Sequence, residues 1–131
     1  MNKRTRIILS VCLTVLLVFG IGGYAHVSNY YQADETALEA MAYQTDSVQA
    51  EQDGNVIWFV PEDPTAGLIL YPGGKVEYTA YAPLLRACAE NGILCALVRM
   101  PGNLAVLDAN AADGLQQEHP KIPTWYIAGH S

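Results

Sequence analysis

The last three residues of the sequence, Gly129, His130 and Ser131, are the clearest candidates for covalent chemistry. They fill the first three positions of Gly-x-Ser-x-Gly, a pattern in which the serine is the nucleophile on a tight turn between a strand and a helix. Small residues on either side of the serine let the neighbouring backbone approach closely. The spacing predicts Ser131 as the nucleophile of an acyl-transfer site. An ordinary turn after a strand is the alternative interpretation, because Gly-x-Ser alone is a short pattern.

A second turn could supply the other half of such a site. Pro72, Gly73, Gly74 and Lys75 follow the apolar run 67–71. Acyl transfer requires backbone N–H donors aimed at the developing oxyanion, and glycine brings the main chain within reach because it has no Cβ. We therefore expect the Gly74 amide to be the first oxyanion donor. The alternative is a turn that needs glycine only for a positive φ.

The segments before these turns predict how the sheet begins. The strand-like runs 47–50 and 55–60 flank Asp53 and Gly54, and Asp-Gly between two such runs is a hairpin signal. The first two strands should therefore be antiparallel.

The segments that follow alternate between strand and helix. Residues 67–71, 93–98 and 124–128 have strand character, and the run 124–128 resembles a buried strand. Helical spacing covers residues 77–90, with a stop at Asn91 and Gly92. A shorter helical stretch covers residues 109–118, with Asp108 or Asn110 as its amino cap.

This alternation is typical of a parallel sheet, and ligands of such sheets bind at the carboxyl ends of the strands. The turns that contain Gly74 and Ser131 should consequently meet at one edge.

The amino terminus predicts a membrane segment. Residues 7–25 contain no charge and follow Lys3, Arg4 and Arg6, the pattern of an anchor whose amino terminus lies inside, or of a signal peptide cleaved near Ala25. We expect residues 1–25 to be the anchor or signal, residues 26–42 a spacer, and residues 43–131 the folded domain. The domain would be held outside the cytoplasm, or secreted if cleavage occurs.

Composition excludes several classes of partner. Beyond residue 25, thirteen acidic residues stand against four basic ones, a net charge of −9, so nucleic acid is not an expected partner. His26, His119 and His130 lack metal-ligand spacing, and no metal or cofactor is expected.

The three cysteines differ in their setting. Cys12 lies in the apolar run. Cys88 and Cys95 could form a disulfide or remain two free thiols, and their spacing does not decide between these.

Taken together, several stretches resemble a known family. They run from about residue 43 to the end and include residues 71–76, 80–84, 97–101, 103–105, 110–113 and 125–131. They are similar to a bacterial branch of the α/β-hydrolase fold related to the dienelactone-hydrolase group. The resemblance implies an eight-stranded, mostly parallel sheet and a triad in the order Ser, acid, His. It also implies an oxyanion hole built from the loop after the third strand and the amide that follows the serine. Ser131 matches the nucleophile and Gly74 the loop donor.

The same resemblance places the acid, the base and the last three strands after Ser131. Residues 43–131 would then be the amino-terminal half of the α/β sheet, strands 1–5, truncated at the nucleophile turn. His119 precedes its strand and should lie a strand length, about 17 Å, from Ser131, and Asp108 is explained by capping. We expect no measurable esterase activity from residues 1–131 alone.

The favoured function is a serine hydrolase that acts on a carboxylic ester or a similar acyl bond of a small molecule. A non-catalytic fragment or binding domain of hydrolase ancestry is one alternative, and an acyltransferase that uses the same serine is another. The sequence predicts no particular oligomeric state.

Overall fold

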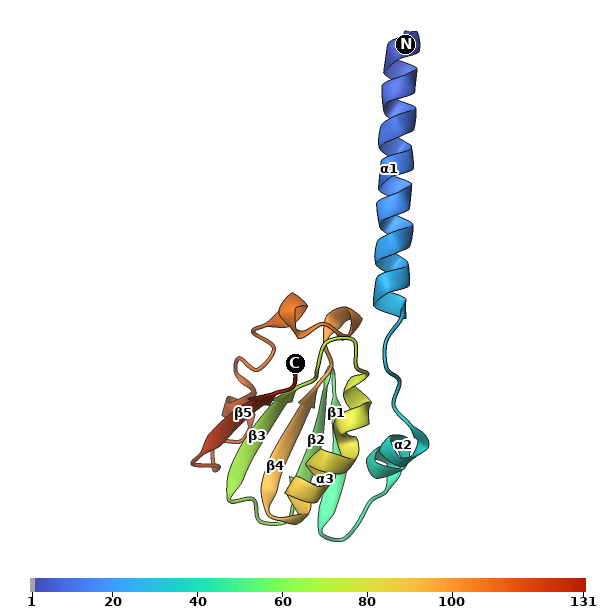
Figure 1. Cartoon of the computed structure of the whole chain (residues 1–131). Helices are drawn as coiled ribbons and strands as arrows, with labels where there is room; N and C mark the ends of the chain where they lie inside the picture. Colours follow the sequence, from blue (N-terminus) through green and yellow to red (C-terminus); the bar gives the residue numbers. More distant parts are fainter. Residues whose placement is uncertain (1) are drawn as a thin grey trace.

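The computed structural model describes residues 2–131 and shows a five-stranded sheet beside one long helix, α1 (Lys3–Ser28) (Figure 1). The spatial order of the strands is β1-β2-β4-β3-β5. Their bounds are β1 Val48–Asp53, β2 Val56–Pro61, β3 Ala66–Tyr71, β4 Ile93–Val98 and β5 Trp125–Gly129. This mixed sheet confirms the predicted fold class.

The predicted hairpin is present, with its turn moved by one residue. β1 and β2 are antiparallel, and Asp53 still pairs with Val56, so Gly54 and Asn55 form the two-residue turn. Gly54 has a φ of +55°, a left-handed conformation that glycine adopts without steric cost. β2 pairs antiparallel with β4. β3 lies between β4 and β5 and is parallel to both, as the strand and helix alternation predicted.

The helix predicted over residues 77–90 forms in two parts. A 3₁₀ turn, η1 (Tyr78–Tyr81), leads into α3 (Ala82–Glu90), which has Pro83 in its first turn. Proline is tolerated there because the first helical N–H groups have no partner within the helix. After α3, Gly92 takes a φ of +84° and ends the helix where expected.

The prediction of a second α-helix over residues 109–118 is wrong. The chain instead forms three short 3₁₀ segments: η2 Pro101–Asn103, η3 Ala105–Asp108 and η4 Leu115–Glu118. Gly114 has a φ of +87°, outside the right-handed helical region, and it interrupts the stretch just before η4. Neither Asp108 nor Asn110 therefore caps an α-helix.

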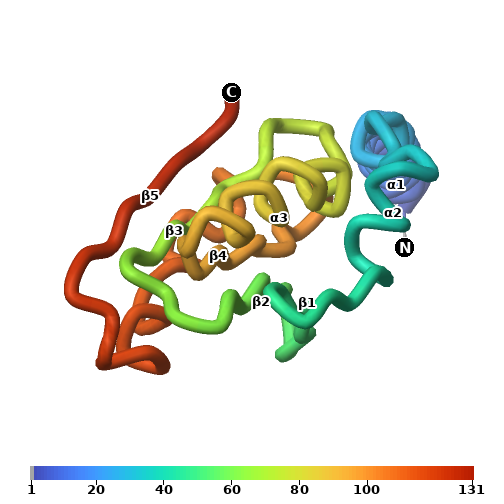
Figure 2. The backbone as a smooth tube through the Cα atoms, turned by 90° about the horizontal axis from the view of Figure 1, so that it is seen from below, coloured from blue at the N-terminus to red at the C-terminus, as the bar shows by residue number. Residues whose placement is uncertain are grey.

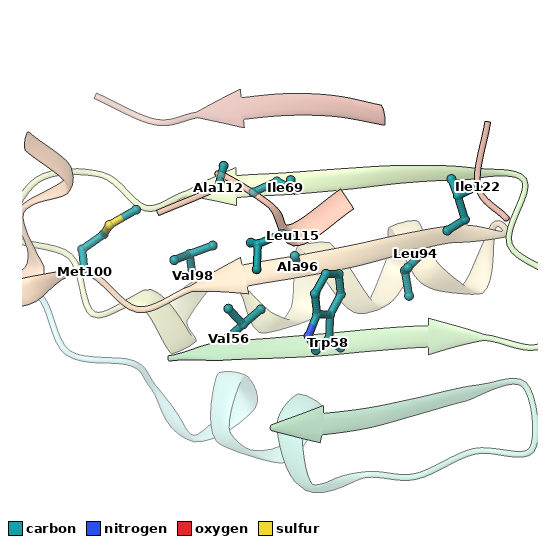
Figure 3. Packing of buried hydrophobic residues seen from close by; sticks show 10 residues of the cluster. All are labelled: Val56, Trp58, Ile69, Leu94, Ala96, Val98, Met100, Ala112, Leu115 and Ile122. Atoms are coloured by element: carbon teal, nitrogen blue, oxygen red, sulfur yellow. The ribbon is translucent and has the colours of Figure 1, made fainter. Parts of the chain in front are cut away.

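Each face of the sheet carries its own apolar core. On one face lies α3 (Figure 2), whose inward side chains form a core with residues of β2, β3 and β4. On the other face, the connection from β4 to β5 covers a cluster around Trp58 (Figure 3). That cluster contains Val56, Trp58, Ile69, Leu94, Ala96, Val98, Met100, Ala112, Leu115 and Ile122. Irregular 3₁₀ turns therefore cover this face in place of the helix predicted from the sequence.

β5 forms the edge of the sheet within the described residues. Tyr126 and Ile127 are 59% and 66% exposed, so within residues 2–131 this strand is not buried as its residue pattern predicted. The strand is held mainly by backbone pairing with β3 and by Trp125, which packs over Gly67.

Replacing Gly67 by alanine is expected to weaken the attachment of β5, because the new Cβ would overlap the indole ring of Trp125. Overpacking of this kind costs about 1–3 kcal/mol. Chemical denaturation would measure the loss. Gly129→Ala is the matched control at the far end of the same strand pair, where a Cβ would lie 4.0 Å from its nearest contact, Cβ of Tyr71. Equal stabilities for the two variants would contradict the role of this contact.

The predicted spacer contains a helix that packs on the domain. α2 (Glu35–Ala42) contacts α3, and its Ala37 is buried. The buried Arg86 guanidinium donates through Nε to the carbonyl of Ala40 at 2.6 Å and through Nη2 to the carbonyl of Tyr43. The guanidinium thus donates to backbone carbonyls at the end of α2, which have no hydrogen-bond partners within the helix. The division at residues 25 and 42 stays a prediction.

α1 is long and apolar enough to cross a membrane. It spans 26 residues, has a mean hydropathy of 2.4 and buries none of them against the rest of the chain. A helix of this kind near the amino terminus fits either a membrane anchor or a signal sequence.

All three cysteines are free thiols, and Cys95 is fully buried in β4. Burial, with a smaller contribution from Cys88, raises the pKa of the Cys95 thiol from 9.0 to about 12. The neutral thiol is therefore favoured in the folded state. Up to about pH 9 the thiol is neutral in both the folded and the unfolded state, so it does not make the free energy of unfolding depend on pH. Between about pH 9 and about pH 12 the unfolded thiol ionises while the folded one does not, so stability falls.

We expect this difference to cost on the order of 1 kcal/mol per pH unit across that range. The free energy of unfolding would be measured in detergent micelles for the wild type and for Cys95→Ala. The difference separates the contribution of Cys95 from that of other groups that titrate between about pH 9 and about pH 12. The wild type should lose stability more steeply than the variant as the pH rises. Parallel curves would show that Cys95 makes no such contribution.

Candidate active site

The two turns expected to form the site meet at the carboxyl edge of the parallel strands. Tyr71, the last residue of β3, pairs with Gly129, the last residue of β5. The His130 amide continues the pairing and donates to the Tyr71 carbonyl at 3.2 Å. This register brings the residues that follow Tyr71 beside the residues that follow Gly129.

A tyrosine hydroxyl from η1 joins the two turns. The Gly73 amide donates to Oη of Tyr81 at 2.9 Å, and the same oxygen lies 2.7 Å from Nδ1 of His130. The Tyr81 and His130 rings meet edge to face. The His130 side chain is thereby held against the Gly73 turn, and the Gly73 amide is already engaged. Sequence reasoning placed Tyr81 within the helix predicted over residues 77–90 and missed this contact, since nothing local signals it.

Gly73 is required for close approach and not for an unusual φ. A Cβ on Gly73 would lie 2.5 Å from Nδ1 of His130 and 2.9 Å from Oη of Tyr81. The residue with a positive φ in this turn is Lys75, at +60°. The interpretation that Gly73 and Gly74 only supply a positive φ is therefore wrong.

Gly74 lies at an open position of its turn. The residue is exposed, and a Cβ placed on it would meet no atom within 4 Å. Within residues 2–131, its amide donates to no protein acceptor. An N–H group at an open position of a fixed turn is available to an incoming substrate oxygen.

The turn is fixed from two sides. The Lys75 amide donates to the Asn103 carbonyl at 2.8 Å, which attaches the turn to η2. The Lys75 carbonyl accepts from the Tyr31 amide at 2.7 Å, and the Tyr31 carbonyl accepts from the Glu77 amide at 2.8 Å. Tyr31 and Val76 thus form a parallel bridge between the segment that follows α1 and the candidate site.

Ser131 is exposed, and within residues 2–131 its side chain forms no hydrogen bond.

The His119 ring lies beside two tryptophan rings. Its centroid is 4.6 Å from that of the Trp58 ring and 6.4 Å from that of the Trp125 ring. Trp125 begins β5, and Ser131 follows six residues later, a separation of about 20 Å along an extended chain. As expected, His119 is at the opposite edge and cannot serve as the base for Ser131.

A metal centre is not assembled by the part of the chain that the structure describes, where no group of three His, Cys, Asp or Glu residues is suitably placed. The described residues at this edge offer the Ser131 hydroxyl and the Gly74 N–H group.

Residues 67–131 match the model of the alpha/beta hydrolase family. The matched segment starts in β3, includes the turns of Gly74 and Ser131, and covers just under half of the chain. No curated protein and no solved structure matches the chain. The family match supports an alpha/beta hydrolase ancestry for the segment that carries the candidate site.

Proposed function

We propose that this chain provides the nucleophile half of a serine hydrolase that cleaves a carboxylic ester or a similar acyl bond. The observation that carries the proposal is the meeting of two turns at one sheet edge. Ser131 follows β5, the unengaged amide of Gly74 follows β3, and both lie in the segment that matches the hydrolase family. The proposal makes Ser131 the nucleophile and Gly74 an oxyanion donor.

In the proposed reaction, Oγ of Ser131 attacks the carbonyl carbon of the ester and its proton passes to a histidine base. The electron pair of the C=O bond moves onto oxygen, and the Gly74 N–H stabilises that charge. Collapse expels the alcohol, which takes the proton from the histidine. Water then releases the acid and restores the serine.

The base and its orienting acid would come from residues that follow Ser131, as the resemblance to the dienelactone-hydrolase branch implies. The proposal does not give this role to His130, which directly precedes Ser131 in the chain and whose ring lies against the Tyr81 hydroxyl. The residue after Ser131 would also supply the second oxyanion amide.

We further propose that α1 is an uncleaved anchor that holds the domain outside the cytoplasm. Lys3, Arg4 and Arg6 lie at its amino terminus, and basic residues are retained on the cytoplasmic side of a membrane. The long uninterrupted helix is sufficient to span the hydrocarbon layer.

Sequencing the source gene past codon 131, followed by labelling of the encoded polypeptide with a fluorophosphonate, tests the function. The reading frame should continue into a glycine, a helix and later acid and histidine residues, and the reagent should modify Ser131. Absence of the acid and the histidine, or labelling that persists in Ser131→Ala, would contradict the proposal.

A further inference from the structure

The candidate site and the membrane helix lie at the same end of the domain. In Figure 1, α1 leaves the domain on the side where β3 and β5 end, and Figure 2 shows α1 nearly along its axis. α1 contacts η2, and a Cβ on Gly102 would lie 3.1 Å from Cγ1 of Val27. The Tyr31–Val76 bridge then attaches the chain to the Gly74 turn just after α1 ends.

The connection between helix and domain is too short to separate them. Ser28 ends α1, and Tyr31 is already bonded to Lys75, which leaves two residues between. Three residue steps reach at most about 11 Å when fully extended. The headgroup layer on each side of a bilayer is roughly 5–8 Å thick. A spanning α1 therefore holds the Gly74 turn at or just above the lipid headgroups.

The side chains at this level suit a membrane interface. Tyr24 and Tyr31 are each 77% exposed, and tyrosine is enriched where headgroups meet hydrocarbon. On η3, Val106 is 81% exposed and Leu107 is 60% exposed. This turn lies at the end of the domain that faces α1, among the orange segments of Figure 1. Two adjacent apolar side chains exposed there would be buried by lipid.

A cavity at the same level reaches the candidate oxyanion donor. It has a volume of about 390 Å³. Its lining combines the segment that follows α1 with the Gly74 turn, and consists of Asn29, Tyr30, Tyr31, Gly74 and Lys75. One wall is thus the segment that follows α1, and the other contains Gly74. A substrate in this cavity would have its acyl carbonyl near Gly74 and its apolar chain toward the bilayer.

We propose that this edge of the domain lies on a phospholipid surface, with Val106 and Leu107 inserted, and that the cavity receives the ester of a membrane-resident amphiphile. The substrate class rests on the proposed hydrolase function. The position of the edge rests only on α1, the bridge and the exposed apolar residues.

The position is tested with the full 131-residue chain in phosphatidylcholine vesicles. An environment-sensitive fluorophore is attached to Leu107→Cys in a Cys12→Ala, Cys88→Ala background, where the remaining Cys95 is fully buried. Glu90→Cys is the matched control site, because Glu90 is exposed and is the last residue of α3, at the end of this helix opposite the candidate site. Nitroxide-labelled phosphatidylcholine should quench the fluorophore at position 107 several-fold more than at position 90. Equal quenching at the two sites, or a chain that does not float with the vesicles, would overturn the proposal.

The substrate class is tested in the longer polypeptide that the proposed function requires. The double variant Val106→Asp, Leu107→Asp should lower kcat/KM severalfold for an ester dissolved in phosphatidylcholine vesicles and leave a soluble acetyl ester unaffected. An equal effect on both esters would overturn the lipid substrate. If Ser131→Ala left hydrolysis of both esters intact, the hydrolase assignment would fail, whereas the quenching result would still stand.

Discussion

Ser131→Ala is expected to abolish ester hydrolysis in the longer polypeptide that the proposed function requires. Removal of the nucleophile from a serine triad lowers kcat by roughly 10⁴- to 10⁶-fold, because the remaining groups cannot form the acyl intermediate. The stability should hardly change, since Ser131 is exposed and its side chain forms no hydrogen bond within residues 2–131. Initial rates on a short-chain chromogenic ester would measure the loss.

Ser47→Ala is the matched control for this prediction. Ser47 is also exposed, and it lies just before β1. The Ser47 variant should retain wild-type rates. A Ser131 variant with more than a few per cent of wild-type kcat would remove Ser131 from the mechanism, and comparable losses in both variants would indicate a general effect on folding.

Gly73→Ala is expected to damage both stability and activity. The new Cβ would lie 2.5 Å from Nδ1 of His130, so His130 must leave Tyr81 or the turn must move. Overpacking of a buried site costs about 1–3 kcal/mol. Because Ser131 is bonded directly to His130, displacement of His130 should move the nucleophile, and a misplacement of about 1 Å can cost on the order of 10²-fold in rate.

Gly74→Ala gives the comparison that identifies the cause. A Cβ at position 74 meets no atom within 4 Å, so this variant should retain wild-type stability. It also retains its N–H group, so any loss of activity would come from contact with the substrate. If denaturation showed the two variants to be equally stable, the close approach at Gly73 would not hold the site together.

Much of the sheet could be predicted because its signals are local. The apolar runs of β3 and β4 are bounded by proline and glycine, and a short turn at Gly54 specifies the antiparallel hairpin. The β4–β5 connection was predicted incorrectly for a tertiary reason. Residues such as Ala112 and Leu115 have helical spacing, but they enter the cluster around Trp58 from separate turns and not from one helix.

The candidate site was predictable in position but not in detail. Ser131 and Gly74 could be placed at one edge because parallel strands end there together. The hydroxyl of Tyr81 joins residues 73 and 130, which are far apart in the sequence, and no spacing rule reports such a contact. The positive φ at Lys75 was equally hidden, because lysine rarely adopts it and glycine next to it appeared the natural choice.

The bridge between Tyr31 and Val76 mechanically couples the segment that follows α1 to the Gly74 turn. A force that pulls the domain away from its helix would act first on the backbone bonds between Tyr31 and the strand-like residues 75–77, and so on the Gly74 turn itself. Proteolysis after Ala25 would have a different effect. The freed domain would keep the Tyr31–Val76 bridge, and the Ala33 amide would still donate to Oε2 of Glu77. The Gly74 turn would lose its connection to α1 but keep the contacts that hold it in place.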